Sequence, residues 1–513
     1  GARRGDPEDI ALDYVRRNLD ALGLTESDLD TLEGPETTTV GGITEVRWRQ
    51  AVDGIPSADS ELRVNLTRDG RVLNVLGSPK SGLDPDTTPS VSAAEAVKAV
   101  QDAAGVRRSP APAGTDTELV LYKERLAWRV VYPATSTEVY HALVDAETGR
   151  VVRKHNLVKS AVNVEVWKRF PNGPRETVDI EKYLDAGATT LSGRWVRAFS
   201  DLDDDDVLDP GEDITPVSHP FTPFSGTGCS GTLLCTWAFG TAGSWQTNRA
   251  QNGVQAFYLA NRFAEHLRQP PINFNGFQDE DRLILHTDDG AATGPDAAHL
   301  NNANMLTWPE GQSPRMQMYL WGGTRFRSVN SGDDASILFH EYTHGLTSRL
   351  VVEPVNGFGA LNTPQAGAMG EGWGDWYAKD FLVGEGLEPD NPNVPGEVDM
   401  GVYTDRIPHQ VRNQPIDCPV GASAAACPAS GTAGPGGFTY GDFGKVDGVP
   451  SVHGDGEIWA QTLWDLRTAI GPVHARRLVT NAMRLSPPEP SFLDMRNAIL
   501  QADAAEGAPR RAQ

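Results

Sequence analysis

Residues 336–346 read SILFHEYTHGL, which is the strongest signal in the sequence. His340 and His344 are four positions apart, so on a helix both imidazoles project from one face and can reach one metal ion. Glu341 lies beside them, where a carboxylate can act as a general base. The apolar residues before His340 are typical of a helix buried in the centre of a domain. The alternative is a chance occurrence of the pattern on a surface helix.

A second stretch, residues 368–376 (AMGEGWGDW), offers a third ligand downstream of the two histidines. Catalytic zinc usually has three protein ligands and one open position. Glu371 can complete that set, and Asp375, one helical turn further on, can accept a hydrogen bond from a ligand histidine. The alternative for Glu371 is a solvated carboxylate near the positive end of a helix dipole.

A third stretch, residues 452–459 (VHGDGEIW), places His453 just before an expected helix and after a long irregular segment. A histidine in that position can line the far wall of a cleft and stabilise a developing oxyanion. A lone histidine at a helix start is otherwise usually structural.

Together these motifs resemble the fungalysin family of metallopeptidases, relatives of thermolysin, over most of residues 160–505. The amino-terminal part resembles the propeptide shared by fungalysins and thermolysins, notably at residues 44–50 and 54–56. The resemblance implies an α+β fold, in which a thermolysin-like zincin catalytic domain follows an α+β propeptide of two small antiparallel-sheet modules. The expected boundaries are 1–158 for the propeptide (about 1–83 and 90–158), 159–334 for a β-rich half and 335–513 for a mainly helical half with the zinc site.

Hydrophobic periodicity agrees with this division. It predicts helices over residues 8–23 and 92–104, each followed by an antiparallel meander. It predicts a largely β region with long loops over 160–335, helices over 335–381 and 453–505, and a long loop region over 382–452.

The resemblance also implies a role for each matching residue. The implied roles are zinc ligation by His340, His344 and Glu371, general-base catalysis by Glu341, orientation of the first histidine by Asp375, and transition-state stabilisation by His453. Asn302 and Ala303 match an Asn-Ala pair that holds the substrate backbone, and Arg412 is a candidate for supporting a substrate carbonyl. The helper tyrosine of thermolysin has no clear counterpart, because Asn362 falls near its place.

An acidic stretch, residues 201–212 (DLDDDDVLDPGE), is a candidate calcium loop. The ligand positions 1, 3, 5, 7, 9 and 12 of such a loop fall on Asp201, Asp203, Asp205, Val207, Asp209 and Glu212. Asp206 stands where glycine is usual, which is tolerable because aspartate visits the left-handed region. Flanking helices are not evident, and the alternative is a solvated acidic loop.

Composition and cysteine usage limit the compartment and the partners. Asp plus Glu number 69 against 45 Lys plus Arg, and this negative charge argues against nucleic acid and anionic membranes as partners. No apolar run is long enough to span a bilayer. Cys229 with Cys235, and Cys418 with Cys427, are close couples without the spacing of a cysteine zinc site. Two local disulfides would indicate an oxidising, extracellular compartment, and reduced thiols are the alternative.

These observations predict the proenzyme of a secreted zinc endopeptidase. We expect a monomer that acts on proteins or peptides, with one catalytic zinc ion, a calcium ion as a further candidate, and its own propeptide across the catalytic cleft until cleavage near residues 159–160. The alternatives are a zinc aminopeptidase and a catalytically silent, secreted binding protein on the same fold. The amino-terminal module has its own alternative, an independent binding domain.

Overall fold

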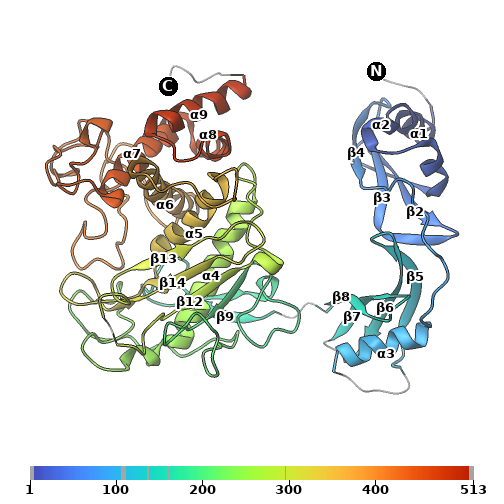
Figure 1. Cartoon of the computed structure of the whole chain (residues 1–513), viewed down its shortest axis with the longest axis horizontal. Helices are drawn as coiled ribbons and strands as arrows, with labels where there is room; N and C mark the ends of the chain where they lie inside the picture. Colours follow the sequence, from blue (N-terminus) through green and yellow to red (C-terminus); the bar gives the residue numbers. More distant parts are fainter. Residues whose placement is uncertain (1–4, 106–110, 136–137, 159–160, 295, 508–513) are drawn as a thin grey trace. The chain divides into compact units, whose positions relative to one another are not determined.

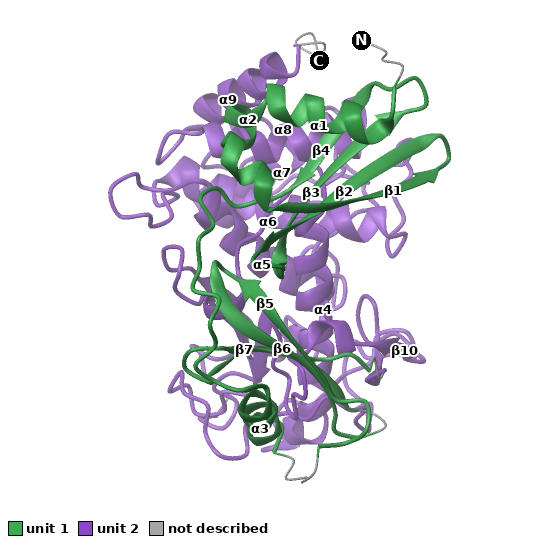
Figure 2. Cartoon of the chain, turned by 90° about the vertical axis from the view of Figure 1, so that its right-hand side faces the viewer, with its two compact units in different colours: residues 1–160 green, residues 161–513 purple. Residues whose placement is uncertain are grey.

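The computed structural model describes residues 5–105, 111–135, 138–158, 161–294 and 296–507. The chain divides into two compact units, residues 1–160 and 161–513 (Figure 2). This division lies two residues beyond the boundary predicted at residue 158. The cleavage point expected near residues 159–160 lies outside the described residues.

Unit 1 repeats one pattern, a helix followed by an antiparallel meander. The first repeat has α1 (Pro7–Arg17), α2 (Leu19–Leu22), β1 (Leu32–Val40), β2 (Ile43–Val52), β3 (Ile55–Thr67) and β4 (Val72–Gly77). The second has α3 (Ala93–Ala103), β5 (Asp116–Tyr122), β6 (Arg125–Pro133), β7 (Val139–Asp145) and β8 (Val151–Asn156). The single helix predicted over 8–23 is interrupted at Asn18, whose backbone leaves the helical region.

The two repeats of unit 1 share one sheet although each has a separate core. β3 pairs with β5 in parallel at Ser57 and Leu121, which gives an eight-stranded sheet in the order β1-β2-β3-β5-β6-β7-β8, with β4 on β3. In the first core, α1 packs Ile10 and Val15 against the β2–β3 hairpin, and in the second α3 packs against β6 and β7. The two sheet modules expected from the sequence are therefore continuous through a single bridge.

The first half of unit 2 combines short strands with one long buried helix. Its strands are β9 (Asn163–Val166), β10 (Glu176–Asp179), β11 (Val196–Phe199), β12 (Leu283–Thr287), β13 (Ala303–Leu306), β14 (Arg315–Met318), β15 (Leu320–Trp321) and β16 (Val329–Asn330). The main sheet has the order β11-β12-β14-β13, and β13 forms its edge, antiparallel to β14 (Figure 1).

The prediction of a largely β region over 160–335 was wrong about α4 (Arg249–Arg268). This helix is buried on most of its circumference, and its buried residues include polar ones such as Gln251, Gln255 and Asn261. Because its apolar residues do not form one stripe, they give no clear helical period in the sequence.

The second half of unit 2 is helical, as predicted. It contains α5 (Ala335–Leu350), α6 (Pro364–Gly384), α7 (Val452–Ile470), α8 (Pro472–Leu485) and α9 (Phe492–Ala505). Helix α6 packs against both α5 and α7 (Figure 1). The approach to α7 requires glycine, because a Cβ on Gly372 would lie 2.6 Å from the carbonyl oxygen of Gly456.

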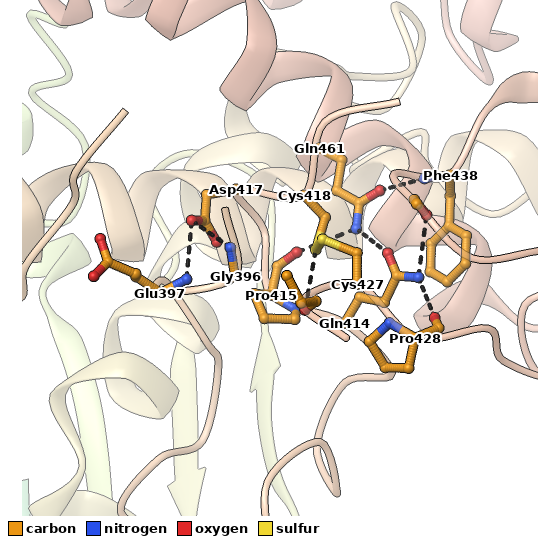
Figure 3. Close-up of a disulfide and its surroundings, with 12 residues drawn as sticks. Gly396, Glu397, Gln414, Pro415, Asp417, Cys418, Cys427, Pro428, Phe438 and Gln461 are labelled. Carbon is orange, nitrogen blue, oxygen red and sulfur yellow. Dashed lines mark hydrogen bonds between the residues drawn. A yellow bond between two sulfur atoms is a disulfide. The ribbon is translucent and has the colours of Figure 1, made fainter. Parts of the chain in front are cut away.

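Between α6 and α7, residues 386–451 contain no α-helix or β-strand, only the short 3-10 turn η6 (Tyr440–Asp442). The disulfide Cys418–Cys427 lies within this segment (Figure 3), and Cys229–Cys235 closes a loop in the first half of the unit. Both predicted local pairings are confirmed. Among the described residues, no helix is long and apolar enough to cross a membrane.

Candidate metal centre and active site

Helix α5 brings the two histidines and Glu341 together in the interior of unit 2. The helix begins after Asp334, whose side chain accepts a 2.8 Å hydrogen bond from the amide of Ser336. The following apolar residues, 337–339, are buried in the main core. His340 and Glu341 are 6% and 7% exposed, so the helix presents both groups to a protected site.

Three candidate ligand side chains converge on one point. His340 Nε2 lies 3.0 Å from His344 Nε2 and 3.4 Å from Glu371 Oε2, and His344 Nε2 lies 3.5 Å from Glu371 Oε1. Tetrahedral zinc with bonds of about 2.0–2.2 Å holds its ligand atoms about 3.3 Å apart. The spacing and the N/O donor set therefore fit a zinc ion with three protein ligands.

Asp375 contacts the first histidine of the motif. Its Oδ1 lies 2.8 Å from His340 Nδ1, one turn after Glu371 on α6. A carboxylate at Nδ1 keeps the proton there, which leaves the Nε2 lone pair for the metal. The two helices can approach this closely because residue 374 is glycine. A Cβ at this position would lie only 2.5 Å from His340 Nδ1.

Arg412 approaches the same carboxylates from the segment between α6 and α7. Its Nε donates to Asp375 Oδ2 at 2.6 Å, and its Nη2 donates to Asp375 Oδ1 at 3.0 Å and to Glu371 Oε2 at 3.1 Å. Nη1 donates to the carbonyl of Val411 at 3.2 Å. Only one of the five guanidinium N–H groups has no bond among these contacts, so the expected support of a substrate carbonyl must use that group.

Glu341 lies in surroundings that suit a proton acceptor. Burial raises the pKa of its carboxyl to about 7; the Glu371 carboxylate adds to the rise and His340 opposes it. A pKa near the working pH is the most effective one for general acid–base catalysis.

His453 is the second residue of α7 and the most accessible group of the site. Its Nε2 lies 3.5 Å from Glu371 Oε2, while 63% of its side chain is exposed. The structure therefore brings it to the solvent side of the metal centre.

The edge strand β13 runs beside α5. The two elements can lie this close because residue 345 of α5 is glycine: a Cβ there would lie 2.5 Å from Cε of Met305 in β13. Ala303 begins β13, and the carbonyl of Asn302 accepts a 3.0 Å bond from Trp321 Nε1. Among the described residues, β13 pairs only with β14, so its outer edge is available to another extended chain.

A cavity of about 310 Å³ adjoins the candidate zinc ligands His344 and Glu371. The residues that line it include His344, Glu371 and the apolar side chains of Met305, Leu361 and Val452. Sequence reasoning missed these three because they come from three separate segments and share no motif. The amide of Asn362 is held by Glu489 at 2.7 Å at the same cavity.

The acidic stretch forms a loop whose two ends, Asp201 and Glu212, are buried, while residues 203–207 between them are exposed. Ligand atoms of Asp201, Asp203 and Glu212 lie within 4.8 Å of one another, as do those of Asp203, Asp205 and Asp209. Val207 is exposed, and Asp206 has the expected positive φ of 65°.

The intervening carboxylates and the first ligand position have protein partners. Asp204 pairs with His299 at 2.8 Å and Asp206 pairs with Arg315. The buried Asp201 lies 3.0 Å from His286 Nδ1, a contact that no sequence motif indicated. Calcium binding by this loop therefore stays a prediction.

Comparison with known proteins agrees with this geometry. The sequence profile of the Fungalysin metallopeptidase (M36) family matches residues 232–510, and that of the Fungalysin/Thermolysin Propeptide Motif matches residues 36–79. The chain is 27% identical to extracellular metalloproteinase 2 of Arthroderma gypseum, with 90% of this chain and 79% of that protein covered. It is 26% identical to extracellular metalloproteinase MEP of Pyricularia oryzae, with 92% and 80% covered. Among solved structures, the Bacillus megaterium YpeB C-terminal domain has 11% identity, covers 31% of this chain and 68% of its own, and has a TM-score of only 0.17.

Proposed function

The chain belongs to the fungalysin family of metallopeptidases, and we propose that it is the proenzyme of a secreted zinc endopeptidase in which Glu341 is the general base. The observation that carries the proposal is the triangle of ligand atoms from His340, His344 and Glu371, with the buried Glu341 beside it. Secretion is supported by the extracellular relatives and by the two disulfides.

The residues of this chain divide the work of peptide hydrolysis. His340, His344 and Glu371 hold the zinc ion, which when bound polarises the scissile carbonyl and makes water more acidic. Glu341 takes a proton from the attacking water and passes it to the leaving amine. His453 donates a hydrogen bond toward the developing oxyanion.

Substrate binding follows from the edge strand and the cavity. An extended peptide adds to the free edge of β13 through main-chain hydrogen bonds, with Asn302 and Ala303 at the start of that edge. The cavity lined by Met305, Leu361 and Val452 accepts a large apolar side chain, and by family resemblance this is the residue just after the cut bond.

The direct test is hydrolysis of casein by the processed protein, before and after removal of metal by a chelator. We expect hydrolysis that is lost with the metal and restored by zinc. A blocked peptide with an acetylated amino terminus separates the alternatives, because an aminopeptidase needs the free amine and a silent binding protein cleaves nothing. Absence of zinc-dependent hydrolysis of both substrates would refute the proposal.

For unit 1 we propose the role of an inhibitory propeptide, supported by the propeptide motif at residues 36–79. The intact chain should then hydrolyse a peptide substrate far more slowly than the same preparation after unit 1 has been released. Equal rates before and after release would favour an independent binding domain.

A further inference from the structure

Arg412 must hold its guanidinium on two carboxylates at once, although it lies in a segment without regular structure. Its guanidinium spans a zinc-ligand candidate, Glu371, and the carboxylate that orients His340, Asp375. No helix or strand holds residues 386–451 in place. Other contacts must therefore fix the backbone next to Arg412.

Before Arg412, Asp405 Oδ2 accepts from the amides of Gln410 and Val411. After Arg412, Glu457 of α7 makes the backbone contacts. One carboxylate oxygen, Oε1, accepts from the amide of Asn413 at 2.9 Å and from its side-chain Nδ2 at 2.8 Å. The other, Oε2, accepts from the amide of Gln414 at 2.9 Å. Glu457 is only 3% exposed, so these bonds form away from water, where charge-assisted hydrogen bonds are strong.

The anchoring residues lie on the same face of α7 as His453. Positions 453, 457 and 461 are each one turn apart, so their side chains lie in one row. Gln461 donates to the side-chain oxygen of Gln414 at 3.1 Å and accepts from the amide of Phe438 at 2.6 Å (Figure 3). One helix face thus holds both His453 and the segment that follows Arg412.

We propose that Glu457 is a positioning residue for the metal centre: it binds the backbone directly after Arg412 and so holds the guanidinium on Glu371 and Asp375. This inference rests on the proposed zinc site. In this arrangement Glu457 acts only through Arg412, since the contacts described for its carboxylate are with residues 413 and 414.

A double-mutant cycle with Glu457→Gln and Arg412→Lys tests the inference. Zinc affinity of the metal-free protein is measured by competition with a chromogenic chelator, and kcat, KM and Tm are measured beside it. We expect Glu457→Gln to lower zinc affinity by about tenfold, the size typical of changes to groups behind metal ligands, and to lower kcat with little change in KM. In the Arg412→Lys background the same change should lower zinc affinity less than about twofold, because coupled residues are not additive.

Gln461→Met is the matched control, since it removes bonds to the Gln414 side chain, Pro415 and Phe438 but spares the bonds of Glu457 to the backbone amides of residues 413 and 414. It should lower Tm and leave zinc affinity unchanged. Additive effects in the cycle, or an equal loss of zinc affinity in Gln461→Met, would overturn the inference. If Glu457→Gln does not fold, Asn413→Ala removes one of the contacts to Glu457, and an unchanged zinc affinity there would also overturn it. Because zinc affinity is measured without substrate, this outcome is independent of whether the protein hydrolyses peptides.

Discussion

His340 Nδ1 lies 2.8 Å from Asp375 Oδ1, although the two residues belong to different helices and are 35 positions apart. Asp375→Asn keeps the size of this side chain but removes the charge that holds the proton at Nδ1. We expect zinc affinity to fall by about 10- to 100-fold, as measured by chelator competition. Glu385→Gln, an exposed carboxylate just after the same helix, is the control and should have wild-type affinity.

Glu341→Gln should separate metal binding from catalysis. The amide cannot accept the proton of the attacking water, so kcat should fall by about 10²- to 10⁴-fold. Zinc content, measured by atomic absorption, should stay at that of the wild type because Glu341 is not a ligand. Wild-type turnover in the variant would remove Glu341 from the mechanism.

Gly374 and Gly370 form a matched pair on α6. A Cβ on Gly374 would lie 2.5 Å from His340 Nδ1, whereas on Gly370 the nearest atom would be Leu361 Cδ1 at 3.7 Å. Gly374→Ala should therefore lower both zinc affinity and Tm, because it forces the ligand histidine away from α6. Gly370→Ala should keep the zinc affinity of the wild type. Its free energy of unfolding should rise by up to about 1 kcal/mol, because alanine has the higher helix propensity. Similar behaviour of the two variants would show that the helix spacing is not set at Gly374.

His266 should make stability depend on pH in the acid range. Burial lowers its pKa to about 3, helped by the charges of Arg476 and Arg262, and its ring packs against Phe263 and Phe381. Between about pH 6.5 and 3 the unfolded state binds the proton and the folded state does not, so stability is lost as the pH falls through this window. At pH 5 this histidine should cost at most about 2 kcal/mol relative to pH 8. Urea unfolding of His266→Phe at the two pH values should show a smaller difference than the wild type; an equal difference would exclude His266 as the cause.

Calcium binding by residues 201–212 is tested by calorimetric titration. Asp203 is exposed and has no cationic partner among the described contacts, so Asp203→Asn should weaken calcium binding without breaking a protein contact. Asp213→Asn, exposed and just outside the loop, should bind as the wild type does. If calcium gives no heat of binding with the wild type, the stretch is a solvated acidic loop and not a calcium site.

Much of the active site was predictable from short-range pattern. Histidines four apart with a glutamate between them, followed by Glu371 and Asp375 one turn apart, carry their geometry in the helical period. The family resemblance then implied the roles of Glu341 and His453, which stay predictions, and the propeptide motif, which the matching profile confirms. The local disulfides were predictable for the same reason, because each joins cysteines a few positions apart.

The buried helix α4 and the contacts of Arg412 were not predictable in this way. Over residues 251–261 helix α4 is buried on all sides, so no exposed polar face creates a period there. Its buried polar side chains bond to distant backbone, as Gln255 does with Trp167 at 2.6 Å. Support of a substrate carbonyl by Arg412 stays a prediction, and its segment has no periodicity that would indicate that the guanidinium binds Glu371 and Asp375.

The sequence by itself determined which candidate zinc ligands and which candidate general base this protein carries, because residue identity and spacing within one helix are properties of consecutive residues. Only the tertiary structure decided how α5, α6 and α7 meet, and therefore that Arg412 binds Glu371 and Asp375 while Glu457 holds the backbone beside it. The physical reason is that these bonds join residues brought together by the packing of separate segments, with glycines such as Gly372 and Gly374 allowing close contact.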